Sequence, residues 1–286
     1  EMMNSQQYIQ FRDMIGQPVN DNIRNLVNKY GISTDWRDEL IKNSAPTSDI
    51  NATLQGGGQT MNYFVSFNHH QEDGLIEASN MRRSTLAARL NSRLNKFFKV
   101  GFSSNFGVQD YSQNSQWADN SQIYAANPLV AAKMALPYDA PYYYSFDEAG
   151  NLVKGDRAAG LLYSQFLLPW FTVANTNQDR KNVTLNLSLN EQFTPVEGLT
   201  FTALQSMFGY DLTSDRASLP YDQFTTPMGQ VIDAHTGGVS ANFSRYYAYT
   251  LTHTAEFRHN FGPHYVNLLL GEETRIQKGR GFGITS

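Results

Sequence analysis

The histidines are the residues of this 286-residue chain whose types and spacing come nearest to a metal or catalytic site. His69 and His70 are adjacent within an expected strand, so their side chains point to opposite faces and do not bind one metal ion. His259 and His264 flank an expected turn, but no third ligand is evident beside them. No Ser/His/Asp set and no pair of carboxylates stands at a catalytic spacing. The sequence therefore predicts no metal site, no catalytic residues, no cofactor and no enzymatic activity.

Two short motifs also contain ligand-binding types of residue, and each has a simpler structural interpretation. Residues 279–283 resemble a phosphate-binding loop only by their glycines, because no strand-to-helix context surrounds them. Residues 147–151 contain Asp, Glu and Asn, whose oxygen atoms suit Ca²⁺, but such clusters are more typical of turns. Both motifs are interpreted as structural, and calcium in the second remains an open alternative.

Aromatic residues of the long segment 111–181 are the candidates for ligand binding. Their flat faces suit the C–H face of a sugar ring, while nearby Asn or Asp side chains hold hydroxyl groups. Packing within the segment is the favoured alternative, because a segment of this length must bury apolar surface to stay ordered. The candidate ligand-binding residues are Trp117, Tyr142, Tyr143, Tyr144 and Trp170.

Long strands with one apolar and one polar face would position the candidate residues named above. In residues 98–110, Val100, Phe102 and Phe106 alternate with small or polar residues such as Gly101 and Ser103. This alternation exceeds the roughly five or six residues of an ordinary strand and matches the roughly nine to eleven that cross a hydrocarbon layer. Because the second face is uncharged and small, it suits the wet lumen of a barrel.

The pattern recurs along the chain. In residues 183–193, Leu185 and Leu187 belong to an apolar set that alternates with Asn, Thr and Ser, which excludes an amphipathic helix. In one expected strand, 199–210, either of two apolar sets might face lipid: Phe201, Ala203 and Met207, or Leu204, Phe208 and Tyr210. We expect about eight strands, at residues 51–55, 61–70, 84–94, 98–110, 183–193, 199–210, 247–258 and 265–273.

The connections between these strands alternate in length. Short links rich in Gly, Pro and Asn predict hairpin turns at one end of the sheet. Longer excursions at 72–83, 111–181 and 211–245 lie at the other end. This asymmetry is the layout of an outer-membrane barrel, with short periplasmic turns and long extracellular loops. The predicted fold class is all-β, an antiparallel transmembrane β-barrel segment of about eight strands with long extracellular loops.

This layout predicts which side chains meet lipid and how deep in the membrane the aromatic residues lie. Val100, Phe102, Leu185 and Leu187 are expected on the lipid face. Aromatic residues are expected at both membrane interfaces, as outer-membrane barrels have them. These residues are Tyr246, Tyr247 and Tyr249 at the outer interface, and Phe257 and Phe261 at the periplasmic one.

Composition excludes several other classes of protein. The chain has no cysteine, so a disulfide scaffold is excluded, and its net charge of -4 argues against a nucleic-acid binder. No apolar stretch is long enough for a membrane helix. Helices are expected at residues 5–15 and 21–29, in a loop before the first strand. Because the chain starts at Glu1 without a secretory signal, we expect that signal to be removed or to lie upstream.

Several segments resemble one known family in the order in which that family has them. The segments are Thr34-Asp35-Trp36, Gly56-Gly57-Gly58, Met61-Asn62-Tyr63-Phe64-Val65-Ser66-Phe67, Gln71-Glu72-Asp73-Gly74-Leu75-Ile76 and Asn95-Lys96-Phe97-Phe98-Lys99-Val100-Gly101. They resemble the TDW…SGG…NYYVSLGY…QDGIV and NKWLKVG signatures of SusC/RagA-type TonB-dependent transporters. The resemblance covers most of the chain and is strongest over residues 34–109. His69 and His70 depart from it, since they replace the more usual Gly-Tyr.

The resemblance implies an importer in the bacterial outer membrane. Members of this family have a single-chain barrel of 22 strands around an N-terminal plug, coupled to the TonB complex. A SusD-like surface lipoprotein closes over their glycan or peptide oligomers. About eight strands at a spacing of about 4.8 Å do not close so wide a barrel, so the chain is expected to be part of one. Its partners would be a SusD-like lipoprotein, TonB through a missing N-terminal region, the lipid bilayer and an oligosaccharide or peptide, and no nucleic acid.

The expected domain organisation is a partial barrel over residues 1–286 without a plug domain. It consists of a helical or loop lead-in (1–50), two hairpins (51–110), the long extracellular loop (111–181) and further hairpins (182–286). The alternative is a soluble all-β carbohydrate-binding or structural module. Strand length and turn asymmetry favour the transporter, and the location of the expressed protein distinguishes the two.

Overall fold

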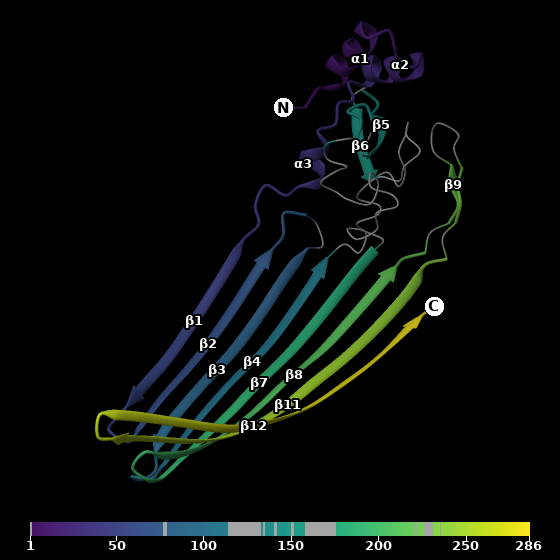
Figure 1. Ribbon diagram of the computed structural model, residues 1–286. Coiled ribbons are helices and arrows are strands. Elements are labelled where there is room, and N and C mark those ends of the chain that lie inside the picture. Colours follow the sequence, from purple (N-terminus) through teal and green to yellow (C-terminus); the bar gives the residue numbers. More distant parts are fainter. Residues whose placement is uncertain are drawn as a thin grey trace.

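The chain folds into one long antiparallel sheet of eight strands, in the order β1-β2-β3-β4-β7-β8-β11-β12 (Figure 1). The computed structural model describes residues 2–76, 79–113, 133, 135–139, 142–149, 152–157, 176–220, 222–225, 231–234 and 236–286. The sheet strands are β1 (Thr47–Gly57), β2 (Met61–Asp73), β3 (Asn80–Arg93), β4 (Phe98–Gln113), β7 (Thr176–Val196), β8 (Leu199–Ser218), β11 (Gly238–Phe261) and β12 (His264–Thr285). The predicted all-β class and the predicted strands are confirmed.

The strands run further than predicted at the end of the sheet where the long connections lie. Strand β7 has 21 residues and β12 has 22, so residues 279–283 lie within β12 and pair with β11. The predicted long excursion at 72–83 is wrong, because β2 continues to Asp73 and β3 begins at Asn80. The alternation of apolar and polar residues ends where neither face of the strand needs apolar side chains. Backbone hydrogen bonds between the strands continue beyond that point, because they need no particular side chain. The sequence pattern therefore underestimates strand length.

The short connections form tight hairpin turns at the opposite end, as predicted. Asn95 accepts hydrogen bonds from the backbone N–H groups of Phe97 and Phe98 at 2.8 and 2.9 Å, which closes the turn between β3 and β4. Gly198 between β7 and β8 has a φ of 84°, a conformation that glycine adopts most readily. Its carbonyl oxygen accepts a hydrogen bond from the Arg258 N–H at 2.7 Å, which ties this turn to β11.

The two faces of the sheet differ in chemistry across all eight strands. Cross-strand partners lie on the same face, and the register places Leu187 between Ser104 and Met207 on the apolar face. Many of its large apolar side chains are exposed in the described chain. The apolar face includes Leu54, Val65, Phe67, Leu86, Leu90, Val100, Phe102, Phe106, Leu185, Leu187, Phe201, Met207, Tyr247, Tyr249, Leu268 and Leu270.

The register also shows which residues of β8 lie on the apolar face. Phe201 lies opposite Ala255 and Met207 lies opposite Tyr249, so these residues belong to the apolar face. Phe208 and Tyr210 therefore point to the polar face, as does Tyr246 opposite Tyr210. Tyr246 was predicted to belong with Tyr247 and Tyr249 to one aromatic row at the outer interface; this is wrong for Tyr246, because its side chain points to the opposite face from theirs.

Aromatic side chains line the short-turn end of the apolar face. Phe193 stacks against Phe98 with ring centroids 4.6 Å apart and against Phe201 at 6.4 Å. The distance along the strand from Tyr247 to Phe261 covers more than half of the 24-residue strand β11, so these residues lie at different heights. This arrangement agrees with two aromatic rows at different depths.

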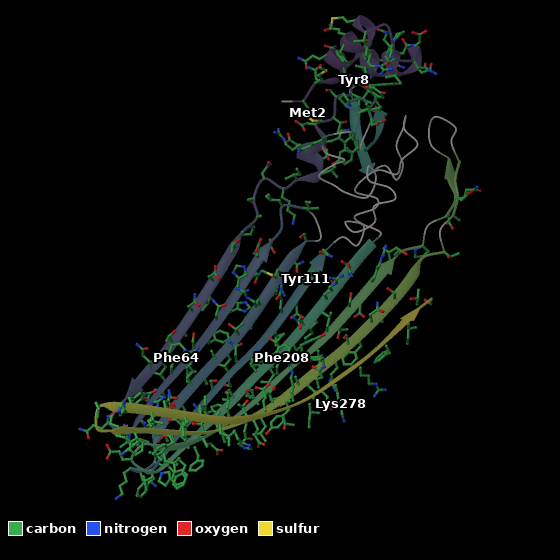
Figure 2. All side chains as sticks on the ribbon, viewed as in Figure 1. Met2, Tyr8, Phe64, Tyr111, Phe208 and Lys278 are labelled. Atoms are coloured by element: carbon green, nitrogen blue, oxygen red, sulfur yellow. The ribbon has the colours of Figure 1, made fainter. Side chains whose placement is uncertain are left out.

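Three helices lie beyond the long-connection end of the sheet: α1 (Ser5–Met14), α2 (Asp21–Tyr30) and α3 (Trp36–Leu40) (Figure 1). Helices α1 and α2 confirm the predicted ones. Ile9, Ile23, Val27 and Tyr138 form a small core here, with Tyr8 packed against it (Figure 2). Within the described residues, no helix is long and apolar enough to cross a membrane.

Candidate transport surface

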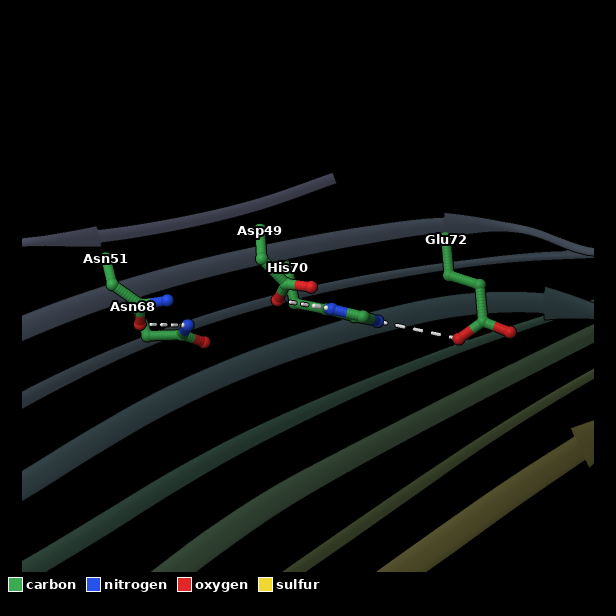
Figure 3. Close-up of polar contacts among 5 residues, drawn as sticks. All are labelled: Asp49, Asn51, Asn68, His70 and Glu72. Atoms are coloured by element: carbon green, nitrogen blue, oxygen red, sulfur yellow. Dashed lines mark hydrogen bonds and ion pairs between the residues drawn. The ribbon is translucent and has the colours of Figure 1, made fainter. Parts of the chain in front are cut away.

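The polar face of the sheet carries amide and hydroxyl groups on most of its strands. Asn68 donates to Asn51 at 2.6 Å (Figure 3). Asn91 donates to Asn62 at 3.1 Å, so these cross-strand amides hold one another in fixed orientations. Further residues of this face are Thr85, Asn105, Thr184, Asn186, Ser206 and Thr250. Amides and hydroxyls both donate and accept hydrogen bonds, so this surface suits a ligand that carries hydroxyl or peptide groups.

His70 lies on this face between two carboxylates. Its Nδ1 is 2.7 Å from Asp49 Oδ1 on the neighbouring strand, and its Nε2 is 3.5 Å from Glu72 Oε2 (Figure 3). His69 points to the other face, where its Nδ1 is 2.9 Å from Ser84 Oγ. The predicted opposite orientation of the two histidines is therefore confirmed. Both ring nitrogens of His70 have carboxylate partners, so these contacts hold the imidazole in one orientation on the polar face.

Three aromatic rings gather on the polar face of β8 and β11. Tyr210 and Tyr246 stack with centroids 5.6 Å apart, and Phe208 lies 6.1 Å from each of them. The Tyr246 hydroxyl donates to Gln277 at 3.1 Å, and Ala248 beside the rings is almost fully buried. Aromatic faces next to hydroxyl and amide groups are able to stack on a planar or ring-shaped ligand group. Sequence reasoning missed this cluster, because the choice between the two faces of β8 depends on the register.

The predicted ligand-binding residues are not brought together by the described structure. Tyr142 lies on β5 (Tyr142–Phe146), half-buried, and its hydroxyl donates to Glu39 at 2.7 Å. Tyr143 and Tyr144 follow on the same strand, but their side chains lie outside the described residues, as do Trp117 and Trp170 entirely. A role in ligand binding for this set stays a prediction.

Trp36 connects the N-terminal segment to the residues that precede β5. Its side chain is fully buried, and its indole N–H donates to the Leu136 carbonyl at 2.9 Å. Thr34 donates through its hydroxyl to the Asp139 carbonyl at 2.8 Å, and its backbone N–H donates to Pro137 at 2.7 Å. Two segments about one hundred residues apart therefore form one unit at the long-connection end.

The remaining motifs have structural roles where they are described. Glu148 and Ala149 are turn residues between β5 and β6 (Leu152–Arg157), as the turn interpretation predicts. His259 lies between two rings, 6.0 Å from Phe257 and 4.5 Å from Phe261. Within the part of the chain that the structure describes, no three His, Asp or Glu side chains are grouped to hold a metal ion.

Comparison with known proteins gives relatives of one kind. No family model matches the chain. The TonB-dependent receptor P3 of Formosa agariphila is 24% identical over 244 residues, which are 84% of this chain and 22% of that receptor. The TonB-dependent receptor SusC of Bacteroides thetaiotaomicron is 26% identical over 115 residues, which are 40% of this chain and 10% of SusC. The chain therefore spans a minor part of the length of the curated relatives it matches.

Solved structures show the same fold. A chain of the RagAB peptide transporter matches all of this chain with a TM-score of 0.74 and 19% identity, and the match covers 33% of that chain. The RagAB peptide importer in its closed-closed state matches with a TM-score of 0.75 and 20% identity, again over 33% of the solved chain. These matches place the eight-stranded sheet as part of a larger barrel wall.

The fold and the two faces thus define a portion of a barrel wall. The chain is similar to part of a SusC/RagA-type TonB-dependent transporter, as the sequence motifs predicted. Its relatives are named as TonB-dependent receptors and as a peptide transporter.

Proposed function

We propose that this chain forms barrel wall and surface loops of an outer-membrane, TonB-dependent importer of the SusC type. The observation that carries the proposal is the sheet itself, which has many large apolar side chains on one face of its eight strands and mostly amide, hydroxyl and charged groups on the other. So large an exposed apolar surface marks contact with a membrane or another protein. The apolar face meets lipid, and the polar face lines the lumen through which cargo passes.

The cargo is a glycan or peptide oligomer, which the importer takes up together with a SusD-like lipoprotein. Support for this comes from the similarity to SusC and from the fold shared with the RagAB peptide transporter. Exposed hydroxyls, amides and the Phe208–Tyr210–Tyr246 cluster offer both hydrogen bonds and ring stacking to such cargo.

The domain organisation follows from the same orientation. The short turns face the periplasm, and the helical lead-in and the long loop over residues 111–181 face outward toward the lipoprotein. Coupling to TonB runs through a plug region that these residues do not include. The loop aromatics Trp117, Tyr142, Tyr143, Tyr144 and Trp170 belong to the surface that meets cargo or lipoprotein.

Location and solubility test this proposal. The protein is expressed in a Gram-negative host with its natural export sequences, and the membranes are fractionated. We expect an outer-membrane species that requires detergent for extraction. Residues 1–286 expressed alone should aggregate in detergent-free buffer, because β1 and β12 present unpaired backbone groups along both edges of the sheet. A soluble monomer with a cooperative unfolding transition would instead favour an all-β carbohydrate-binding module.

A further inference from the structure

A charged side chain interrupts the apolar face near the short-turn end of β7. The residues that this strand places on the apolar face between Val183 and Phe193 are all apolar except Glu191. Its cross-strand neighbours there are Val100 and Ala203, which have no polar side-chain atoms. Within the described part of the chain, the Glu191 carboxylate forms no ion pair or hydrogen bond. An ionisable side chain on a lipid face is costly, so its presence indicates a functional site.

The position of Glu191 in the sheet makes this exposure a property of the wall itself. Strand β7 has β4 on one side and β8 on the other, so both in-sheet neighbours of Glu191 belong to the described strands. Further barrel strands would attach at the edges formed by β1 and β12, and a plug would lie against the opposite, polar face. Neither of them would cover the apolar face of β7.

A mostly apolar hollow of about 600 Å³ lies beside Glu191, over β4, β7, β8 and β11. Ala203 lies between Glu191 and His253 in the register and leaves space there, because its side chain is a single methyl group. His253 has its own carboxylate partner, since its Nδ1 is 2.9 Å from Glu272 Oε1. The short-turn side of the hollow is lined by the rings of the aromatic row, Phe98, Phe193 and Phe201.

The depth of Glu191 places its carboxylate near the lipid headgroups. Two residues separate it from Phe193, and at about 3.3 Å per residue and a strand tilt of about 40° it lies about 5 Å from the aromatic row toward the bilayer centre. No lysine or arginine of the sheet lies near it on this face. Those of the apolar face all lie toward the long-connection end: Arg82, Lys181, Arg245, Lys278 and Arg280. A cationic partner for Glu191 would therefore come from the membrane.

We propose that this hollow binds a phospholipid with a primary ammonium headgroup, from the leaflet that meets the short turns. The ammonium donates hydrogen bonds to the Glu191 carboxylate, and such charge-assisted bonds are strong where water is scarce. One acyl chain lies in the hollow against the aromatic rings. The volume falls within the roughly 300–1,000 Å³ of ligand pockets, so it holds a segment of the lipid while the rest stays in the bilayer. The inference rests on the proposed function, because the apolar face must meet lipid.

Binding of two lipids with the same acyl chains tests the proposal on the purified intact transporter that contains this chain. Native mass spectrometry measures the affinity for phosphatidylethanolamine and for phosphatidylcholine, whose ammonium has the same charge but no N–H donor. The variants are Glu191→Gln, which removes the charge, and Ala203→Leu, which fills the hollow. The matched control is Glu197→Gln, which removes a carboxylate from the turn of the same hairpin outside the hollow.

We expect the unaltered transporter to bind phosphatidylethanolamine about tenfold more tightly than phosphatidylcholine, because only the former donates hydrogen bonds to the carboxylate. Glu191→Gln should reduce this preference to about threefold or less, since an amide oxygen accepts a weaker hydrogen bond than a carboxylate. Ala203→Leu should weaken the binding of both lipids and preserve their ratio. Glu197→Gln should change neither affinity.

Two results would overturn the site. One is equal affinity for the two lipids in the unaltered transporter, and the other is a preference that survives Glu191→Gln or falls equally in Glu197→Gln. Membrane fractionation separates this failure from failure of the proposed function. If the protein is absent from the outer membrane, the proposed function is wrong. If the protein is in the outer membrane but has no lipid preference that depends on Glu191, only the lipid site is wrong.

Discussion

Arginine substitutions at two successive residues of β7 test which face of the sheet meets lipid. Leu187 lies on the apolar face between Ser104 and Met207, and Asn186 lies on the polar face between Asn105 and Phe208. The two sites share strand, depth and backbone pairing, so they differ mainly in the environment of the side chain. Leu187→Arg and Asn186→Arg are therefore matched variants.

The expected cost follows from the depth of Leu187. At about 3.3 Å per residue and a strand tilt of about 40°, Leu187 lies roughly 15 Å above the aromatic row that contains Phe193. An apolar band is about 25 Å tall, so Leu187 is close to the bilayer midplane. Arginine at that depth costs about 2–4 kcal/mol, whereas arginine at position 186 enters a wet lumen and should cost less than about 1 kcal/mol.

Reversible urea unfolding of the intact transporter in liposomes measures both free energies. Tryptophan fluorescence follows unfolding, and heat-dependent mobility on gels confirms that each variant has inserted. We expect a difference of about 2 kcal/mol or more between the two variants. Equal destabilisation by the two substitutions would refute the assignment of faces, and a larger cost for Asn186→Arg would reverse it.

Three further predictions concern turns and the helical unit. Gly198→Ala should destabilise the barrel by more than Gly262→Ala in the same unfolding assay, because both glycines have positive φ but only a Cβ at Gly198 would overlap a backbone oxygen of β11. The Gly262 variant should cost about 1–2 kcal/mol from the left-handed conformation alone, and equal costs would contradict the contact between the Gly198 turn and β11. Trp36→Phe should remove the indole hydrogen bond and speed amide exchange in α3 without changing exchange in the sheet; unchanged exchange in α3 would argue against this anchor. Arg24 donates hydrogen bonds to Asp13 and so lowers the pKa of that carboxyl. The pair therefore stabilises the packing of α1 and α2 at pH values above the ordinary Asp pKa. This stabilisation is lost as the pH falls through the lowered pKa. The protection factors of the α1 amides, which compare each exchange rate with its intrinsic rate at the same pH, should fall on acidification in the natural protein and change less in an Asp13→Asn variant.

The amino-acid sequence by itself determined the approximate positions of the sheet strands and of their short turns. Alternation of apolar and polar residues, as around Phe102 and Leu187, is a local property that backbone geometry converts directly into a two-faced strand. Turn residues such as Asn95 and Gly198 are equally local, because each satisfies a conformational need of its own hairpin. Both kinds of signal hold without knowledge of what lies next to the strand.

Only the tertiary structure decided what depends on register and on distant partners. Pairing of β8 with β11 assigned Phe208 and Tyr246 to the polar face, and a shift of one residue would have reversed that assignment. Trp36 bonds with Leu136, and Glu191 lies opposite Ala203, through contacts that no local pattern encodes. The sequence pattern also did not predict how far the strands continue beyond their apolar residues, because backbone pairing needs no particular side chain. Local chemistry therefore determined the elements, and the pairing of those elements determined the sites.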